Sequence, residues 1–154
     1  MTHNTETSVI IRTFNEEKYL PGLLRALKQQ NYKNFETIIV DSGSIDTTRD
    51  IARTFNISLL KIAKRDFTFG YSLNYGIKNS KGTYLVLVSA HTKPTDDNWM
   101  GNLIEPLRDE QTAMAYGRQL GVEQSKYGEI EDFRRLFAGG GEVSIKPSNF
   151  FTFL

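Results

Sequence analysis

The sequence contains no cysteine, and its other absences also limit what the chain can do. Without cysteine there is no disulfide framework, no thiolate nucleophile and no zinc cluster, which fits a reducing compartment. No apolar run approaches the roughly 20 residues of a membrane span, and the polar start MTHNTETS lacks the basic and apolar regions of a signal peptide. These absences predict a cytoplasmic location and no transmembrane segment.

The chain also has little net charge. Its 19 basic and 18 acidic residues leave a formal charge of +1, so neither a nucleic acid partner nor a membrane-binding surface is predicted. Hydrophobic residues make up 39% of the 154 residues, which excludes a disordered chain. A single domain of this length buries roughly two-thirds of the surface that its unfolded chain exposes.

Two common phosphate-binding motifs are missing. There is no GxGxxG dinucleotide fingerprint and no GxxxxGK[ST] P-loop. Polar residues instead follow successive apolar runs, namely Glu16, Asp41, Asn74 and the segment 89–91. Carboxylates at strand ends suit hydrogen bonds to a nucleobase N–H or to ribose hydroxyls better than contact with phosphate, because like charges repel.

Residues 35–48, FETIIVDSGSIDTT, join an apolar run to a polar loop. The continuous β-branched run TIIV is typical of a strand covered on both faces, and Asp41 stands at its carboxyl end, where open α/β sheets bind ligands. Ser42 and Ser44 lie in the turn. Ser44 is expected to cap a helix whose first turn carries Asp46, which favours the helix dipole. The alternative is a strand, turn and capped helix with no ligand.

Apolar runs alternate with helical patterns along the first 110 residues. Strands are expected at 8–13, 37–40, 57–62, 83–88 and 112–120, and helices at about 19–30, 44–55, 70–79, 97–108 and 127–137. Short connections between them predict a three-layer α/β/α Rossmann-like fold with a mostly parallel sheet, in which the run 83–88 lies centrally. A flavodoxin-like signalling domain, with Asp41 accepting a phosphoryl group, is the unrelated alternative.

Several motifs in order carry a resemblance to a known family. VIIRTFNEEKYLPGLLRAL, ETIIVDSGSIDTT, FGYSLNYGIKNSKGTYLVLVSAH and TDDNW resemble the N-terminal half of a family 2 glycosyltransferase with the GT-A fold, over residues 8–119. FxFG, SLNxG and the GRQ at 117–119 resemble rhamnosyltransferase-like bacterial members. The resemblance implies inverting transfer of a hexosyl or deoxyhexosyl group from a nucleotide diphosphate to the hydroxyl of a saccharide or lipid-linked acceptor, in surface polysaccharide synthesis.

The resemblance also implies a donor-binding site. Its members by position, from the nucleoside to the diphosphate, are Thr13, Asn15, Glu16, Asp41, Ser42, Ser44, Asp46, Asn74, Ser89 and His91. Glu16 would lie near the ribose or base, Asp41 at the base edge, and Asn74 near the ribose and diphosphate. Structural alternatives remain for three of them: Asn15 as a helix cap, Asp46 as a helix-dipole partner and Asn74 as a solvated helix residue.

The chain departs from the family at the metal motif. The family carries Asp-x-Asp after the fourth strand, holding Mg or Mn against the diphosphate, where this sequence has Ser89-Ala90-His91. A hydroxyl and an imidazole bind a hard divalent cation less strongly than two carboxylates do. His91 could still ligate Mn, or contact the diphosphate directly. A weak or absent metal site is therefore predicted.

The catalytic base is not evident. General-base work needs a carboxylate within hydrogen-bond reach of the acceptor hydroxyl, and Glu129, Glu131 and Asp132 are weak candidates in KYGEIEDFRR, where a solvated helical face is the ordinary explanation. The family's base follows an aromatic run like NFFTFL. Residues 1–154 are thus expected to be the donor-binding half of one C-terminally truncated domain. The alternative is a binding fragment without catalysis, and the aromatic terminus suggests a homo-oligomer.

Overall fold

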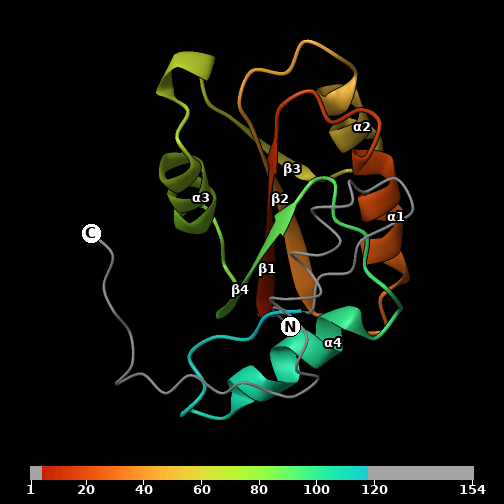
Figure 1. Ribbon diagram of the computed structural model, residues 1–154, viewed down its shortest axis with the longest axis vertical. Coiled ribbons are helices and arrows are strands. Elements are labelled where there is room, and N and C mark those ends of the chain that lie inside the picture. Colours follow the sequence, from red (N-terminus) through yellow and green to blue (C-terminus); the bar gives the residue numbers. More distant parts are fainter. Residues whose placement is uncertain (1–4, 118–154) are drawn as a thin grey trace, which may run out of the picture. The chain divides into compact units, whose positions relative to one another are not determined.

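The structure, a computed structural model, describes residues 5–117 (Figure 1). It divides into two units, one ending at residue 101 and the other beginning at residue 102, with the boundary inside α4 (Trp99–Ile104). The first unit contains strands and helices in alternation: β1 (Thr7–Thr13), α1 (Leu20–Gln29), β2 (Phe35–Asp41), α2 (Thr48–Thr54), β3 (Ser58–Lys61), a 3-10 helix (Lys64–Asp66), α3 (Phe69–Lys78) and β4 (Tyr84–Ser89). In the second unit, the described residues form the end of α4 and a 3-10 helix (Glu105–Arg108). The single domain over 1–154 stays a prediction.

The four strands form one parallel sheet in the order β3-β2-β1-β4. This is the order of the Rossmann-like doubly wound type, whereas a flavodoxin-like sheet has the order 2-1-3-4. The predicted α/β fold with a mostly parallel sheet is therefore confirmed, and the flavodoxin-like alternative is wrong. Strand order reverses between β1 and β4, which makes that pair the topological switch point, where open sheets bind ligands.

Helices cover both faces of the sheet, α3 on one and α1 and α2 on the other (Figure 1). On the α3 face, Ile10, Ile38 and Val40 form a core with Leu73 and Ile77 of α3 packed against it. On the other face, α1 contributes a buried stripe at the expected helical spacing, namely Leu20, Leu23, Leu24 and Leu27. The two sheet faces thus carry separate apolar layers, as the continuous β-branched runs predict.

The close approach of α3 to the sheet depends on Gly76. A Cβ at this position would lie 2.6 Å from Cγ2 of Ile10 and 3.1 Å from Cγ2 of Val40. Glycine in a helix interior is unfavourable by roughly 0.5–1 kcal/mol relative to alanine, so its presence here has a packing cause. This contact sets how closely α3 approaches the sheet.

Some expectations about the elements were wrong. Among the described strands β4 lies at the sheet edge rather than centrally, with Leu85 and Leu87 39% and 51% exposed. An apolar run indicates a strand but not its number of neighbours, which is set by pairing. Residues 112–117 of the expected fifth strand have no regular structure, and residues 118–120 and 127–137 lie outside the described part. Within residues 5–117, no helix has the length and apolar character needed to cross a membrane.

Candidate functional site

The carboxyl ends of β1, β2 and β4 lead into polar loops at residues 14–19, 42–47 and 90–98. Parallel strands bring these ends to one edge of the sheet, and the β1 and β4 loops flank the switch point. A hollow lined by Thr5, Lys33, Asn34 and Phe35 lies at the opposite end of β1 and β2. Since the chemistry-bearing side chains lie at the carboxyl edge, we place the candidate site there.

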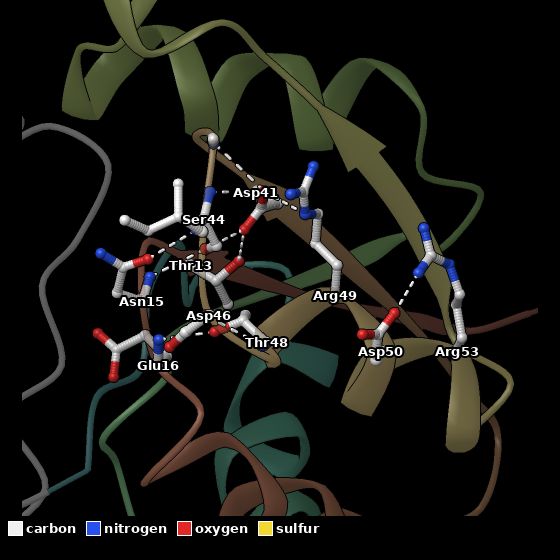
Figure 2. Close-up of polar contacts among 12 residues, drawn as sticks. Thr13, Asn15, Glu16, Asp41, Ser44, Asp46, Thr48, Arg49, Asp50 and Arg53 are labelled. Atoms are coloured by element: carbon white, nitrogen blue, oxygen red, sulfur yellow. Dashed lines mark hydrogen bonds and ion pairs between the residues drawn. The ribbon is translucent and has the colours of Figure 1, made fainter.

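Asp41, the last residue of β2, holds the loop that follows this strand (Figure 2). Its side chain is fully buried. Oδ1 accepts the backbone N–H groups of Gly43 and Ser44 at 3.2 and 3.1 Å, and Oδ2 accepts the hydroxyls of Thr13, at 3.1 Å, and Ser44. Nε of Arg49 lies 3.9 Å from Oδ1. Asp41 thus shapes the loop through its carboxylate, and its contact with a base edge stays a prediction.

The loop after β1 is joined to the loop after β2 by hydrogen bonds that centre on Asn15. The Asn15 N–H donates to Oγ of Ser44 at 2.9 Å, and the Ile45 N–H donates to Oδ1 of Asn15 at 2.9 Å. Asn15 has a left-handed φ of 55°, which asparagine tolerates better than most residues. One residue on, the Glu16 N–H donates to Oγ1 of Thr48 at 2.8 Å. The two loops therefore form one unit.

The helix-cap interpretations of Asn15 and Ser44 are wrong. The N-cap residues are Tyr19 for α1 and Thr47 for α2, and neither side chain makes a capping hydrogen bond. Asparagine and serine are favoured N-cap residues, but the sequence pattern placed the start of α2 too early. The hydroxyl of Ser44 instead bridges Asp41 and Asn15, because the loop between β2 and α2 is longer than the expected turn.

Asp46 lies before α2 rather than in its first turn, and it connects both loops. Its Oδ1 accepts the Thr48 N–H at 3.0 Å, and its Oδ2 accepts the Glu17 N–H at 3.1 Å. Burial raises the pKa of Asp46, but hydrogen bonds from the side chain and backbone of Thr48 and from the Glu17 backbone outweigh it, so the pKa lies below its usual 3.8. The ionised carboxylate is the form that this loop stabilises.

Sequence reasoning missed residues that hold these loops. Glu17 accepts both the N–H and the hydroxyl of Thr47, at 3.1 and 2.8 Å, through Oε2. Thr48 and Arg49 contact the loop from α2, as described above. The contacts of Glu17 with Thr47 and of Glu16 with Thr48 join two loops that only the sheet brings together, so nothing in the sequence pairs these residues. Acidic and hydroxyl residues recurring in both loops are the one signal that could have suggested it.

Gln30 is a further missed residue, and it positions the segment after β4. Its amide is buried at the end of α1. Nε2 donates to the Asp96 carbonyl at 2.9 Å, and Oε1 accepts the Met100 N–H at 2.8 Å. The neighbouring Asn31 N–H donates to the Asp97 carbonyl at 2.8 Å. The segment that carries His91 is thereby tied to the helix that follows the β1 loop.

His91 meets Glu16 across the switch point. Nδ1 of His91 lies 3.7 Å from Oε1 of Glu16, and the Tyr19 ring packs edge-on at 6.4 Å between centroids. Oγ of Ser89 lies 3.1 Å from Nε2 of the same ring. The His91 side chain is 64% exposed and that of Glu16 20%. The fold thus brings Glu16, Ser89 and His91 together at the surface.

Two predicted site residues stand apart from these contacts. Asn74 is exposed on α3, and no hydrogen bond or ion pair within the described residues joins it to the other candidates. Ser42 is buried directly after Asp41, and its hydroxyl has no hydrogen-bond partner in the described part of the chain. Buried hydroxyls are nearly always paired, so this one lacks a partner that such groups normally have.

The residues at the metal position do not fit a hard divalent cation. Residues 5–117 contain no group of three or more histidine and acidic side chains that could hold a metal ion. The side chains next to His91 are the Ser89 hydroxyl and the Glu16 carboxylate. Mg and Mn prefer several oxygen ligands. The acidic candidates for catalysis, Glu129, Glu131 and Asp132, lie outside the described residues.

Comparison with known proteins decides the family. The sequence profile described as Glycosyl transferase family 2 matches residues 8–149. The chain belongs to glycosyl transferase family 2. Among relatives, the O-antigen chain rhamnosyltransferase RfbN of Salmonella typhimurium is 31% identical over 115 residues, covering 73% of this chain and 37% of RfbN. This family 2 chain spans about a third or less of the length of the curated relatives it matches.

Solved structures agree with the family 2 assignment and its GT-A fold. Residues 1–349 of TarS from S. aureus superpose with a TM-score of 0.62 at 25% identity, covering 78% of this chain and 39% of TarS. The mannosyltransferase PcManGT from Pyrobaculum calidifontis, solved with GDP-Man and Mn2+, gives a TM-score of 0.64 at 22% identity, covering 70% and 33%. The second likeness concerns the fold alone.

Proposed function

We propose that this chain binds a nucleotide-diphosphate sugar at the carboxyl ends of β1, β2 and β4, as the donor-binding part of a glycosyltransferase. The observation that carries the proposal is the approach of His91 to Glu16 across the switch point, at 3.7 Å. The Glu16 carboxylate can accept hydrogen bonds and the His91 ring can donate one. Both lie where open α/β sheets bind nucleotides. TarS, which resembles this chain in structure, was also crystallised with UDP.

The two joined loops would hold the nucleoside. Hydrogen bonds through Asn15, Ser44 and Asp46 join the two loops by their own groups, which limits the backbone ordering that binding requires. Glu16 offers a partly exposed carboxylate to ribose hydroxyls or a base N–H. In this arrangement Asp41 and Thr13 act by shaping the loop, and contact between the buried Ser42 hydroxyl and the nucleotide stays a prediction.

The diphosphate would be held with little help from a metal. A divalent cation would neutralise the phosphate charges, and PcManGT was solved with Mn2+, so a cation is compatible with this fold. In this chain His91 is the single ligand at the expected position, beside the Ser89 hydroxyl. We propose that His91 donates a hydrogen bond to the diphosphate, in the place of a metal ion.

The complete reaction would be transfer of the sugar to an acceptor hydroxyl, with inversion, during synthesis of a cell-surface polysaccharide. The name of RfbN, an O-antigen chain rhamnosyltransferase, supports this class of product. The sugar, a saccharide or lipid-linked acceptor, a homo-oligomer and a cytoplasmic location stay predictions. Because the chain spans about a third of its relatives, binding of the donor without catalysis is the second candidate.

Calorimetric titration with UDP, dTDP and GDP tests the donor site. We expect one of them to bind, and Glu16→Gln to weaken it by about tenfold, or ~1.4 kcal/mol. Asp50→Asn, on the exposed surface of α2, is the charge-matched control and should leave the affinity unchanged. Binding of none of the three nucleotides, or equal affinity in Glu16→Gln, would overturn the proposal.

A second measurement separates enzyme from binding fragment. Hydrolysis of the bound nucleotide sugar, and its transfer to a hydroxyl acceptor, would be followed for the 154-residue chain and for a version extended beyond Leu154. Transfer by the shorter chain excludes the binding-only candidate. Transfer by the extended chain alone shows that the donor site is here and that the residues completing the reaction lie elsewhere.

A further inference from the structure

Arg12 carries a positive charge near the carboxyl end of the inner strand β1. It follows Ile10 by two residues, so both lie on the α3 face, and it is in register with Val40 on β2 and Ser89 on β4. The centre of its guanidinium group lies 4.4 Å from the centroid of the Phe69 ring. Phe69 is the first residue of α3 and is 67% exposed.

Arg12 has no acidic partner in the part of the chain that the structure describes. Other arginines at this edge are paired: Arg49 faces Asp41, and Arg65 lies 3.7 Å from Asp66. A ring face interacts with the flat face of a guanidinium group, whereas the five N–H donors lie in its plane and remain for other acceptors. A half-buried cation with free donors is suited to an incoming anion.

The platform under Arg12 is held in place by its own neighbours. The Phe67 ring packs edge-on against Phe69 at 5.4 Å, and Oγ1 of Thr68 caps α3 by accepting the Tyr71 N–H at 3.0 Å. The contact of Gly76 with the sheet sets the depth of the helix. The backbone of Phe69 is therefore positioned by the start of α3, and its exposed ring contacts Phe67 and Arg12.

We propose that Arg12, stacked on Phe69, is a phosphate-recognition site on the α3 side of the sheet edge. Paired N–H donors of arginine match two phosphate oxygens, and a stacked guanidinium loses less freedom on binding. Its register with Ser89 puts this site beside the β4 loop of the proposed donor site. The phosphate is either that of the donor diphosphate or that of a phosphate-linked acceptor. The choice between these sources rests on the proposed function, whereas phosphate binding itself does not.

The test follows the Nε–Hε resonance of Arg12 by NMR, assigned from its loss in Arg12→Lys. Inorganic pyrophosphate, UDP and uridine are the probes, at constant ionic strength with sodium chloride. We expect a saturable shift with pyrophosphate and none with uridine. By calorimetry, Arg12→Lys should bind pyrophosphate at least about tenfold more weakly, and Phe69→Leu about threefold more weakly. Arg65→Gln, a charge change on the neighbouring exposed segment, is the control and should match the unaltered chain.

Each outcome has a distinct meaning. If Arg12→Lys loses affinity for both pyrophosphate and UDP, the site binds the donor diphosphate. If it loses affinity for pyrophosphate but binds UDP unchanged, the site binds an acceptor phosphate. If no UDP binds while the Arg12 resonance still shifts with pyrophosphate, the proposed function fails and the phosphate site stands. The inference is wrong if the Arg12 resonance of the unaltered chain shows no saturable shift with pyrophosphate or UDP. It is also wrong if chloride causes an equal shift.

Discussion

Nδ1 of His91 lies 3.7 Å from Oε1 of Glu16, and this contact joins the loops that follow the first and the fourth strand. It is an ion pair only while the imidazole is protonated. The pair spans the point at which strand order reverses, so a nucleotide bound there would meet both side chains. This chain has Ser89 and His91 where the family's metal motif has two carboxylates. The predictions about metal dependence follow from this difference.

Restoring a carboxylate at position 91 should restore metal dependence. In the unaltered chain we expect Mn2+ to change nucleoside diphosphate affinity by less than about tenfold, or ~1.4 kcal/mol. In His91→Asp the increase with Mn2+ should exceed that value, because a carboxylate is a better ligand for a hard cation. Calorimetry with and without Mn2+ measures it, with His91→Asn as the uncharged control. If the aspartate has no effect, His91 lies away from the diphosphate.

Asp46 should make stability depend on acidic pH. Its lowered pKa means that the folded chain favours the ionised form, so its contribution is complete above the usual value of 3.8 and is lost as pH falls through the lower folded pKa. Asp46→Asn should therefore lower the free energy of unfolding at pH 7 by about 1 kcal/mol, and the gap should close below pH 3.8. Urea unfolding from pH 7 downwards measures this.

The control for Asp46 is Asp50→Asn, a carboxylate on the exposed surface of the helix that follows, α2. Asp50 forms an exposed ion pair with Arg53, which should contribute about 0.5 kcal/mol or less. An equal loss in both variants at pH 7, or a gap for Asp46→Asn that does not narrow in acid, would contradict the assigned role of the loop hydrogen bonds.

Gly76→Ala should destabilise the fold although alanine is the better helix former. The added Cβ would lie 2.6 Å from Cγ2 of Ile10, so α3 must move away from the sheet, at about 1–3 kcal/mol. Gly22→Ala is the matched control, because a Cβ there meets nothing within 4 Å and should stabilise α1 by up to about 1 kcal/mol. Thermal unfolding of both variants checks the opposite signs. Equal signs would mean that α3 does not pack as described.

Gln30→Leu should weaken the anchorage of the segment after β4. The change leaves the Asp96 carbonyl and the Met100 N–H without their partner, at about 1–3 kcal/mol. Gln29→Leu, at the exposed neighbouring position, should have little effect. Hydrogen exchange of the Met100 amide measures the local effect. Unchanged protection in Gln30→Leu would show that the segment is held by other contacts.

Local sequence patterns were enough to place most of the elements. The strands β1 to β4 and the helices α1 and α3 lie within a few residues of their expected positions, since β-branched runs and leucine spacing act over short distances. The start of α2 was placed too early, because Ser44 and Asp46 are equally suited to a cap and to a long loop. Likewise, the apolar run of β4 indicated a strand without indicating its edge position.

The sequence by itself determined the fold class, the family resemblance and the edge of the sheet at which we propose the site. These depend on periodicity and on motif order, both of which can be recognised in the amino-acid sequence. Only the tertiary structure decided that Asp41 turns inward to Thr13 and Ser44, that Glu16 meets His91, and that Arg12 rests on Phe69. Each of these contacts joins segments distant in sequence, and their distance is set by strand order and helix packing, which no local pattern encodes.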